Sequence, residues 1–331
     1  MKKKKVKAII LFSGGLDSIL AAKLILDQGV EAEGVIFTSV FYSSIDDAKN
    51  AAKELGIKLK VFEISREFFK VFKNPRYGYG SNLNPCIDCH IFMFKKAGFY
   101  MKKIGADFLV TGEVLGERPM SQNRTTMKVI EKQSGFEGLI LRPLSAKYME
   151  PTIPEKEGMV DREKFLSITG RSRKPQIELA EKFGVKKYPA PAGGCLLTDV
   201  GFSRRMRDLM EDKKSFSVND VELLKTGRHF RLNSRAKLVV GRDEKENKRL
   251  LTLIKDGDYA FSPCQTKGPF AAGRGEFSEE AILTASGIVA RYCDKETARE
   301  IKIANRRKPE KKLSFVTVLP MDNKDIDVFR I

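Results

Sequence analysis

Short apolar runs alternate with amphipathic segments through the first half of the chain, and this alternation constrains the fold more than any other feature. Strand-like runs occupy 7–12, 34–41, 58–64, 107–113 and 139–145. Helical spacing of apolar residues is found in 18–28, 45–56 and 91–104. Strands that alternate with helices form βαβ units. The pattern therefore predicts an α/β fold with a doubly wound parallel sheet and helices on both of its faces.

The segment FSGGLDS (12–18) lies where the first predicted strand gives way to the first predicted helix. Two glycines allow a tight turn that brings backbone N–H groups close to a ligand, and a helix N-terminus attracts anions. Ser13 and Ser18 add hydroxyl donors. The segment fits neither GxGxxG nor GxxxxGK[ST], so dinucleotide and P-loop sites are poor interpretations. It predicts a phosphate site, with a plain capped turn as the alternative.

The charge of the chain points to a polyanionic partner. Lys and Arg total 61 against 43 Asp and Glu, which gives a formal net charge of +18. The surplus is spread over the chain, since 201–331 holds 28 basic and 20 acidic residues. Phosphate contacts with counterion release are the usual use of such a surface, although a lysine-rich proteome would give the same balance. No apolar stretch is long enough for a membrane span, and we expect a cytoplasmic protein without a membrane partner.

Three of the five cysteines stand in informative positions. Cys86 and Cys89 form a CxxC in NPCIDCH (84–90), just before a predicted helix, and Cys195 follows Pro-Ala-Gly-Gly. A helix N-terminus lowers the pKa of a thiol, so we expect reactive thiolates there. Three thiols suit a soft metal or an iron–sulfur cluster, and they suit persulfide chemistry equally well. Structural zinc is a weaker alternative, because it would need His90 or His229 as a fourth ligand.

SGGLDS resembles the pyrophosphate-binding signature of the PP-loop ATPases, which share the adenine nucleotide α-hydrolase-like fold. These enzymes cleave ATP between the α and β phosphates and adenylate a carbonyl oxygen. The resemblance implies that Ser13, Gly14, Gly15, Asp17 and Ser18 hold the pyrophosphate and that Asp17 helps to place Mg²⁺. The family includes amide-forming synthetases as well as enzymes that thiolate tRNA.

Further segments resemble the tRNA thiouridine synthases within that family. NPCIDC is similar to their NPDxxC segment, and ADFLVTGE (106–113), LRPLSAK (141–147) and 173–199 follow their pattern. Cys89 falls on the catalytic cysteine and Cys195 on the second one. Cys86 stands where the two-cysteine enzymes carry Asp, as in the members that bind a [4Fe–4S] cluster through three cysteines. We favour cluster binding by Cys86, Cys89 and Cys195 over a persulfide mechanism of Cys89 and Cys195.

The pattern of apolar and charged residues changes after Asp199, and we expect two domains, 1–200 and 201–331. The second has basic amphipathic and strand-like segments that predict a smaller α+β domain. HFRLNSRAKLVVGRDEKENKRLL resembles the RNA-associated domain known as NFACT-R. A generic packing or dimerisation domain is the alternative interpretation.

Together these features predict an enzyme, an ATP-dependent tRNA sulfurtransferase. Its expected catalytic residues are Asp17, Cys89 and Cys195, and its expected cofactors are ATP, Mg²⁺ and the [4Fe–4S] cluster. Its partners would be tRNA and a sulfur donor, either sulfide or a cysteine desulfurase. A PP-loop ligase acting on a small molecule is the second hypothesis, and a non-enzymatic RNA-binding module is the third. The sequence leaves open which uridine carbonyl is modified.

Overall fold

The computed structural model describes residues 5–42, 45–190, 194–212, 215–294 and 300–331. The chain divides into two compact units, Met1–Thr198 and Asp199–Ile331, each with apolar cores of its own. Within the described residues, no helix is both long enough and apolar enough to cross a lipid bilayer.

The first unit contains a five-stranded parallel sheet of order β3-β2-β1-β4-β5. The strands are β1 (Lys7–Leu11), β2 (Glu31–Thr38), β3 (Lys58–Glu63), β4 (Phe108–Thr111) and β5 (Ile140–Leu141). The helices are α1 (Leu16–Leu26), α2 (Ile45–Glu54), α3 (Ser65–Lys73), α4 (Cys86–Lys103), α5 (Arg124–Ser134), α6 (Ile153–Lys156) and α7 (Lys174–Lys182).

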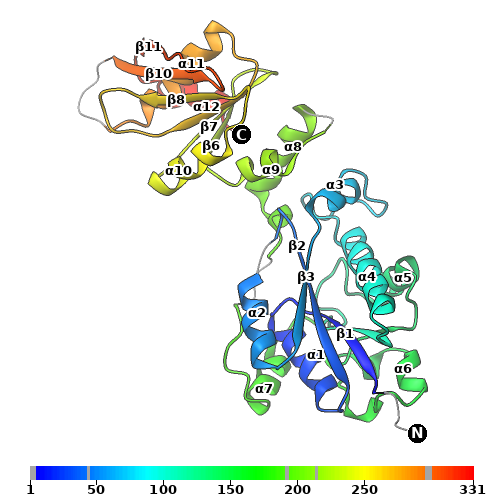
Figure 1. The fold of residues 1–331 in the computed structure, drawn as a ribbon. Coiled ribbons are helices and arrows are strands. Elements are labelled where there is room, and N and C mark those ends of the chain that lie inside the picture. Colours follow the sequence, from blue (N-terminus) through cyan, green and yellow to red (C-terminus); the bar gives the residue numbers. More distant parts are fainter. Residues whose placement is uncertain (1–4, 43–44, 191–193, 213–214, 295–299) are drawn as a thin grey trace. The chain divides into compact units, whose positions relative to one another are not determined.

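Helices cover both faces of this sheet, so its central strands are apolar on both sides. Ala8 and Ile10 of β1 face a core shared with α1 and α2. On the other side of the sheet α4 packs against β1 and β4, and α5 lies against α4 (Figure 1). The predicted doubly wound α/β fold is therefore confirmed.

The second unit contains a six-stranded antiparallel sheet of order β11-β10-β8-β9-β7-β6. Its strands are β6 (Arg228–Arg231), β7 (Ala236–Val240), β8 (Tyr259–Pro263), β9 (Ala271–Gly275), β10 (Ile301–Arg307) and β11 (Ser314–Val318). Its helices are α8 (Val200–Asp212), α9 (Val218–Leu224), α10 (Glu244–Leu253), α11 (Glu279–Arg291) and α12 (Asn323–Phe329). The smaller α+β unit agrees with the prediction.

The two faces of this sheet are covered to different extents. One face packs on α11 and α12 around Phe230, Phe261 and Ile288. The other face is covered by α9 and α10 only over β7 and β9, where Leu250 and Leu253 pack on Val239 and Ala272.

Candidate functional site

The loop between β1 and α1 leaves room for no side chain at its first glycine. Gly14 has φ +76°, and a Cβ there would lie 2.6 Å from the backbone N and Cα atoms of Ala48 in α2. Only glycine meets both conditions. Its neighbour Gly15 is the N-cap of α1 and has no side chain with which to bond the first N–H groups of that helix. These N–H groups are therefore available to an anion.

The two serines of the loop are bonded to the turn itself. The Ser18 hydroxyl donates to the Gly15 carbonyl at 2.8 Å, and the Gly15 N–H donates to the Ser13 hydroxyl at 3.3 Å. Ser13 Oγ and Ser18 Oγ are 3.3 Å apart. Ser18 is buried whereas Ser13 is exposed. The hydroxyls thus hold the shape of the turn, and Ser13 remains accessible to a ligand.

Several buried polar atoms next to this loop have no hydrogen-bond partner among the described residues. They are Asp17 Oδ1, Arg173 Nε and both amide atoms of Gln176. Burial raises the pKa of Asp17, while the charges of Arg173 and Arg118 and the nearby Gln176 amide, which forms no hydrogen bond with it, act in the opposite direction. Unpaired buried polar groups are costly and call for an explanation. A phosphate-bound Mg²⁺ at Asp17 and phosphate oxygens at Arg173 fit these unpaired atoms chemically.

Two loops bring these arginines to the beginning of α1. Gly112 lies against it so closely that a Cβ would stand 2.5 Å from the carbonyl carbon of Asp17. Beyond Gly112, the Leu115 carbonyl accepts from the Gly170 N–H and from the Thr169 hydroxyl, both at 2.8 Å. Arg118 and Arg173 follow these paired positions along the two loops. Gln176 gave no signal in the sequence.

The CxxC lies inside a helix. The prediction that it precedes the helix is therefore wrong. Cys86 is the first residue of α4 and Cys89 stands in its first turn. Cys195 reaches this region through backbone bonds of its neighbours, since Leu196 N–H donates to Phe41 O at 3.0 Å and Leu83 N–H donates to Leu197 O at 3.2 Å. Residues 191–193 of the Pro-Ala-Gly-Gly segment lie outside the described residues.

The predicted lowering of the thiol pKa is wrong for Cys89. Burial raises the pKa of Cys89, and the neighbouring thiols of Cys195 and Cys86 raise it further. Burial likewise raises the pKa of Cys195 to about 11. The helix N-terminus is outweighed because desolvation disfavours the thiolate more strongly. Tyr42, whose own pKa is raised by burial and by Cys89, closes this region.

The three thiols influence one another, as a three-cysteine site requires. Their donor set suits an iron–sulfur cluster chemically. Even so, no group of three or more His, Cys, Asp or Glu side chains in the described parts of the chain is arranged to hold a metal ion.

A buried network links the thiols to the phosphate loop, and the sequence did not reveal it. Glu113 accepts from His90 Nδ1 at 2.8 Å and from Arg142 Nε at 2.9 Å. Arg142 also pairs with Glu131. Burial alone would raise the pKa of Glu113, but Arg142 and His90 hold it at about 2. Two features of the sequence could have indicated this network: Glu113 directly follows Thr-Gly, and Arg142 lies in the segment LRPLS.

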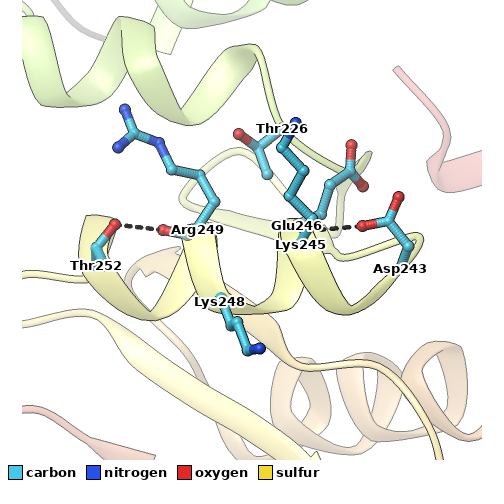
Figure 2. A pocket seen from close by; sticks show the side chains of 7 residues that line it. All are labelled: Thr226, Asp243, Lys245, Glu246, Lys248, Arg249 and Thr252. Carbon is cyan, nitrogen blue, oxygen red and sulfur yellow. Dashed lines mark hydrogen bonds between the residues drawn. The ribbon is translucent and has the colours of Figure 1, made fainter.

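The second unit has a shallow pocket of about 640 Å³ along α10 (Figure 2). It is lined by Thr226, Asp243, Lys245, Glu246, Lys248, Arg249 and Thr252. Arg249 pairs with Glu222 at 3.0 Å, and Lys248 pairs with Glu244 at 2.6 Å. The side chain of Asp243 caps the helix by accepting from the Glu246 N–H. Because Arg249 and Lys248 each pair with a carboxylate, these two cations give no argument for an anion site.

Each unit contains a segment that matches the model of a known protein family. Residues 4–151 match the family described as thiamine biosynthesis protein (ThiI). Residues 227–330 match the family described as NFACT protein RNA binding domain. The predicted resemblances to PP-loop tRNA thiolation enzymes and to NFACT-R are confirmed.

Curated relatives agree with these matches. The tRNA-specific 2-thiouridylase MnmA of Syntrophotalea carbinolica is 34% identical over 125 residues, which cover 34% of this chain and 36% of that protein. Its counterpart in Pseudomonas fluorescens is 25% identical over 246 residues, 69% of this chain and 62% of that protein. An uncharacterised protein of Methanocaldococcus jannaschii is 35% identical over 115 residues, 34% of this chain and 42% of that protein. The chain thus spans about a third of the length of the first of these relatives.

Proposed function

We propose that this protein is an ATP-dependent tRNA sulfurtransferase that adenylates a uridine carbonyl oxygen and replaces it with sulfur. One observation carries the proposal: residues 112 and 113 connect a phosphate loop to a thiol site. Gly112 abuts the backbone of Asp17, and Glu113 holds the ring of His90, the residue after Cys89. A nucleotide at the loop and a sulfur atom at the thiols would therefore serve one reaction.

In the first step, the uridine carbonyl oxygen attacks the α phosphorus of ATP and pyrophosphate leaves. The free N–H groups of α1 and the Ser13 hydroxyl would hold the departing pyrophosphate. Gly14 and Gly15 allow its close approach, and Ser18 fixes the turn. Mg²⁺ at Asp17 would supply further neutralisation of the phosphate charge. Holding the charge and the in-line geometry is the main contribution of a protein to such a step.

In the second step, a sulfur nucleophile attacks the activated carbon and AMP leaves with the former carbonyl oxygen. We assign delivery of this sulfur to the site of Cys86, Cys89 and Cys195. Two routes are open: a [4Fe–4S] cluster held by all three thiols, or a persulfide on Cys89 that Cys195 resolves. For the cluster route the sulfur would come from sulfide, and for the persulfide route it would come as sulfane sulfur from the persulfide of a cysteine desulfurase, whose own cysteine is released as the thiol. Both routes need Cys195 near Cys89, and the influence of the Cys195 thiol on the pKa of Cys89 is in keeping with this requirement without choosing between the routes.

The test of the adenylation step is the release of AMP and pyrophosphate in the presence of tRNA and ATP. Asp17→Asn should reduce this release by at least a hundredfold, because it removes the charge that would face metal and phosphate. Binding of tRNA should change by less than twofold. Asp27→Asn, at the far end of the same helix, is the control. Release of ADP and phosphate by the unaltered protein would show that the assignment is wrong, and turnover without tRNA would favour a small-molecule ligase.

The test of the sulfur route is tRNA thiolation by single Cys→Ser variants reconstituted anaerobically with iron and sulfide. If a cluster is used, changing Cys86, Cys89 or Cys195 should each abolish thiolation and the visible absorption of the protein. If a persulfide is used, Cys86→Ser should retain most of its activity. Cys264→Ser, at an exposed thiol of the second unit, serves as the control.

A further inference from the structure

One end of the sheet in the second unit carries an uncovered face. Register places Phe315 of β11 opposite Ala304 of β10, and Ala304 opposite Ser262 of β8. Ile303 and Phe261, with the opposite parity, belong to the core under α11. Phe315 therefore points away from that core. Helices α9 and α10 cover this second face only farther along, over β7 and β9.

The aromatic ring on this face is exposed and stands beside a cation. Phe315 is 52% exposed, and Leu313, which directly precedes β11, is 49% exposed. The ammonium group of Lys302 lies 4.7 Å from the centroid of the Phe315 ring. Ala304, directly across from Phe315, is small and leaves the ring standing above the sheet. The result is a flat apolar surface with a positive rim.

The charge around the face has one sign. Between 302 and 312 there are six basic residues and one acidic residue, Glu310. The basic residues are Lys302, Arg306, Arg307, Lys308, Lys311 and Lys312. Lys302, Arg306, Lys311 and Lys312 are exposed, and none of them forms an ion pair with a carboxylate in the described parts of the chain. Unlike Lys248 and Arg249 of α10, these are available to an external anion.

We propose that the outer face of β10 and β11 binds unpaired nucleotides of RNA, with one base stacked on Phe315 and phosphates held by Lys302 and Arg306. An aromatic ring on an open sheet provides a stacking surface that accepts any base, and lysines and arginines follow the phosphate backbone. A base must leave its helix to reach such a ring, so this surface selects single-stranded RNA over duplex. The inference rests on the proposed function and specifies how its RNA is held.

A protein partner is a different occupant for the same surface, and the charge argues against it. Protein interfaces are depleted in lysine at their centres, whereas Lys302 stands over the central ring here. An acidic polymer with planar groups matches both properties of the face at once. RNA is such a polymer.

The absence of tryptophan from the chain makes a direct experiment possible. In the full-length protein, Phe315→Trp places a single fluorophore on the face, and Leu283→Trp places one on α11 at a side chain that is equally exposed, 51%. Each variant is titrated with a 12-nucleotide oligouridine and with a 12-base-pair RNA duplex. For Phe315→Trp we expect saturable quenching of the indole fluorescence by the oligouridine and weak quenching by the duplex. For Leu283→Trp we expect no quenching by either RNA.

Affinity provides the second measurement. Phe315→Ala should weaken oligouridine binding about tenfold, in keeping with loss of one stacked base. Lys302→Gln should reduce the slope of log affinity against log salt by about 0.7. Equal quenching in Phe315→Trp and Leu283→Trp, or unchanged oligouridine affinity of Phe315→Ala, would overturn the proposal. So would a change in oligomeric state of Phe315→Ala with unaltered RNA binding, which would identify a protein interface.

These outcomes separate the RNA surface from the enzyme activity. Phe315→Ala should still release pyrophosphate at saturating tRNA, because the variant leaves the phosphate loop intact. If oligouridine quenches the Phe315→Trp variant but the protein releases no pyrophosphate, the RNA surface would be supported and the proposed reaction would be contradicted.

Discussion

At the scale of single residues, the candidate nucleotide site is marked by polar atoms that have no partner rather than by those that do. Gln176 is fully buried, and neither its oxygen nor its nitrogen is bonded within the described structure. Asp17 Oδ1 and Arg173 Nε are also buried without a hydrogen-bond partner in the described structure. Each such atom costs about 1–3 kcal/mol of stability. A protein retains them where a ligand satisfies them, so they support the proposed binding of a nucleotide at this loop.

This reasoning predicts opposite effects of Gln176→Leu on stability and on activity. Replacing an unbonded amide with an apolar group of similar size should raise the free energy of unfolding of the ligand-free protein by about 1 kcal/mol. The same change should raise the KM for ATP about tenfold, because the amide no longer meets the nucleotide. Urea unfolding and pyrophosphate release measure the two effects. Gln122→Leu is the control: Gln122 accepts from Arg118 N–H at 3.2 Å, so this change should destabilise the protein. A destabilised Gln176→Leu would contradict the argument.

The sequence predicted those conformational features of the candidate site that depend on local pattern. Gly14 is an example, because a turn at a strand end demands glycine whatever surrounds it. The thiol pKa of Cys89 was not predictable in this way, since burial and the approach of Cys195 from a distant loop decide it. Gln176 was not predictable either, because nothing in a helical sequence shows which polar side chain will be buried without a partner.

At the scale of elements, the buried ion pairs of Glu113 connect four pieces of secondary structure. Glu113 follows β4, His90 lies in α4, Arg142 follows β5, and Glu131 lies in α5. Burial of these charges is tolerated because each has an opposite partner. The network thereby fixes the start of α4, and with it Cys89, relative to the end of β4.

The network predicts a specific loss of stability in acid. The folded-state pKa of Glu113 is about 2, below the ordinary value of 4.5, so its contribution is complete above pH 4.5 and is lost as the pH falls toward 2. The shift corresponds to about 3 kcal/mol. Glu113→Gln should be less stable than the parent at pH 6 by several kcal/mol, and the difference should shrink at pH 3. Urea unfolding at both pH values measures this. Glu163→Gln, an exposed pair with Lys147, should show no such dependence. An unchanged difference at pH 3 would argue against the assigned pKa.

Elements with continuous apolar runs were predictable, and elements with mixed composition were not. β1 and β4 are buried on both faces, so their sequences are continuous apolar runs that predict strands without knowledge of the neighbouring elements. In the second unit β8, β9 and β10 were missed, because Ser262, Arg274 and Lys302 interrupt their apolar residues. The start of α4 was placed five residues late, since Cys86 to His90 carry little helical signal.

At the scale of the whole molecule, the chain joins a unit with nucleotide chemistry to a unit with basic surface. Each has its own apolar cores, built on Phe108 and Val110 in the first and on Phe230 and Phe261 in the second. The net charge of +18 is shared between them. This division suits a large polyanionic substrate that contacts both units, with recognition in one unit and reaction in the other.

It follows that RNA binding and adenylation should separate when the chain is cut between the units. A protein ending at Thr198 should remain folded, because the two apolar clusters described in the first unit contain no residue beyond that point. It should bind ATP as the full chain does. Its affinity for tRNA should fall at least tenfold at physiological salt, because the basic surface of the second unit has been removed. The slope of log affinity against log salt should also become less steep, since fewer phosphates are neutralised. Filter binding across a salt series and nucleotide titration provide the measurements. Equal tRNA affinity and equal slope for the shortened and full chains would assign RNA recognition to the first unit alone.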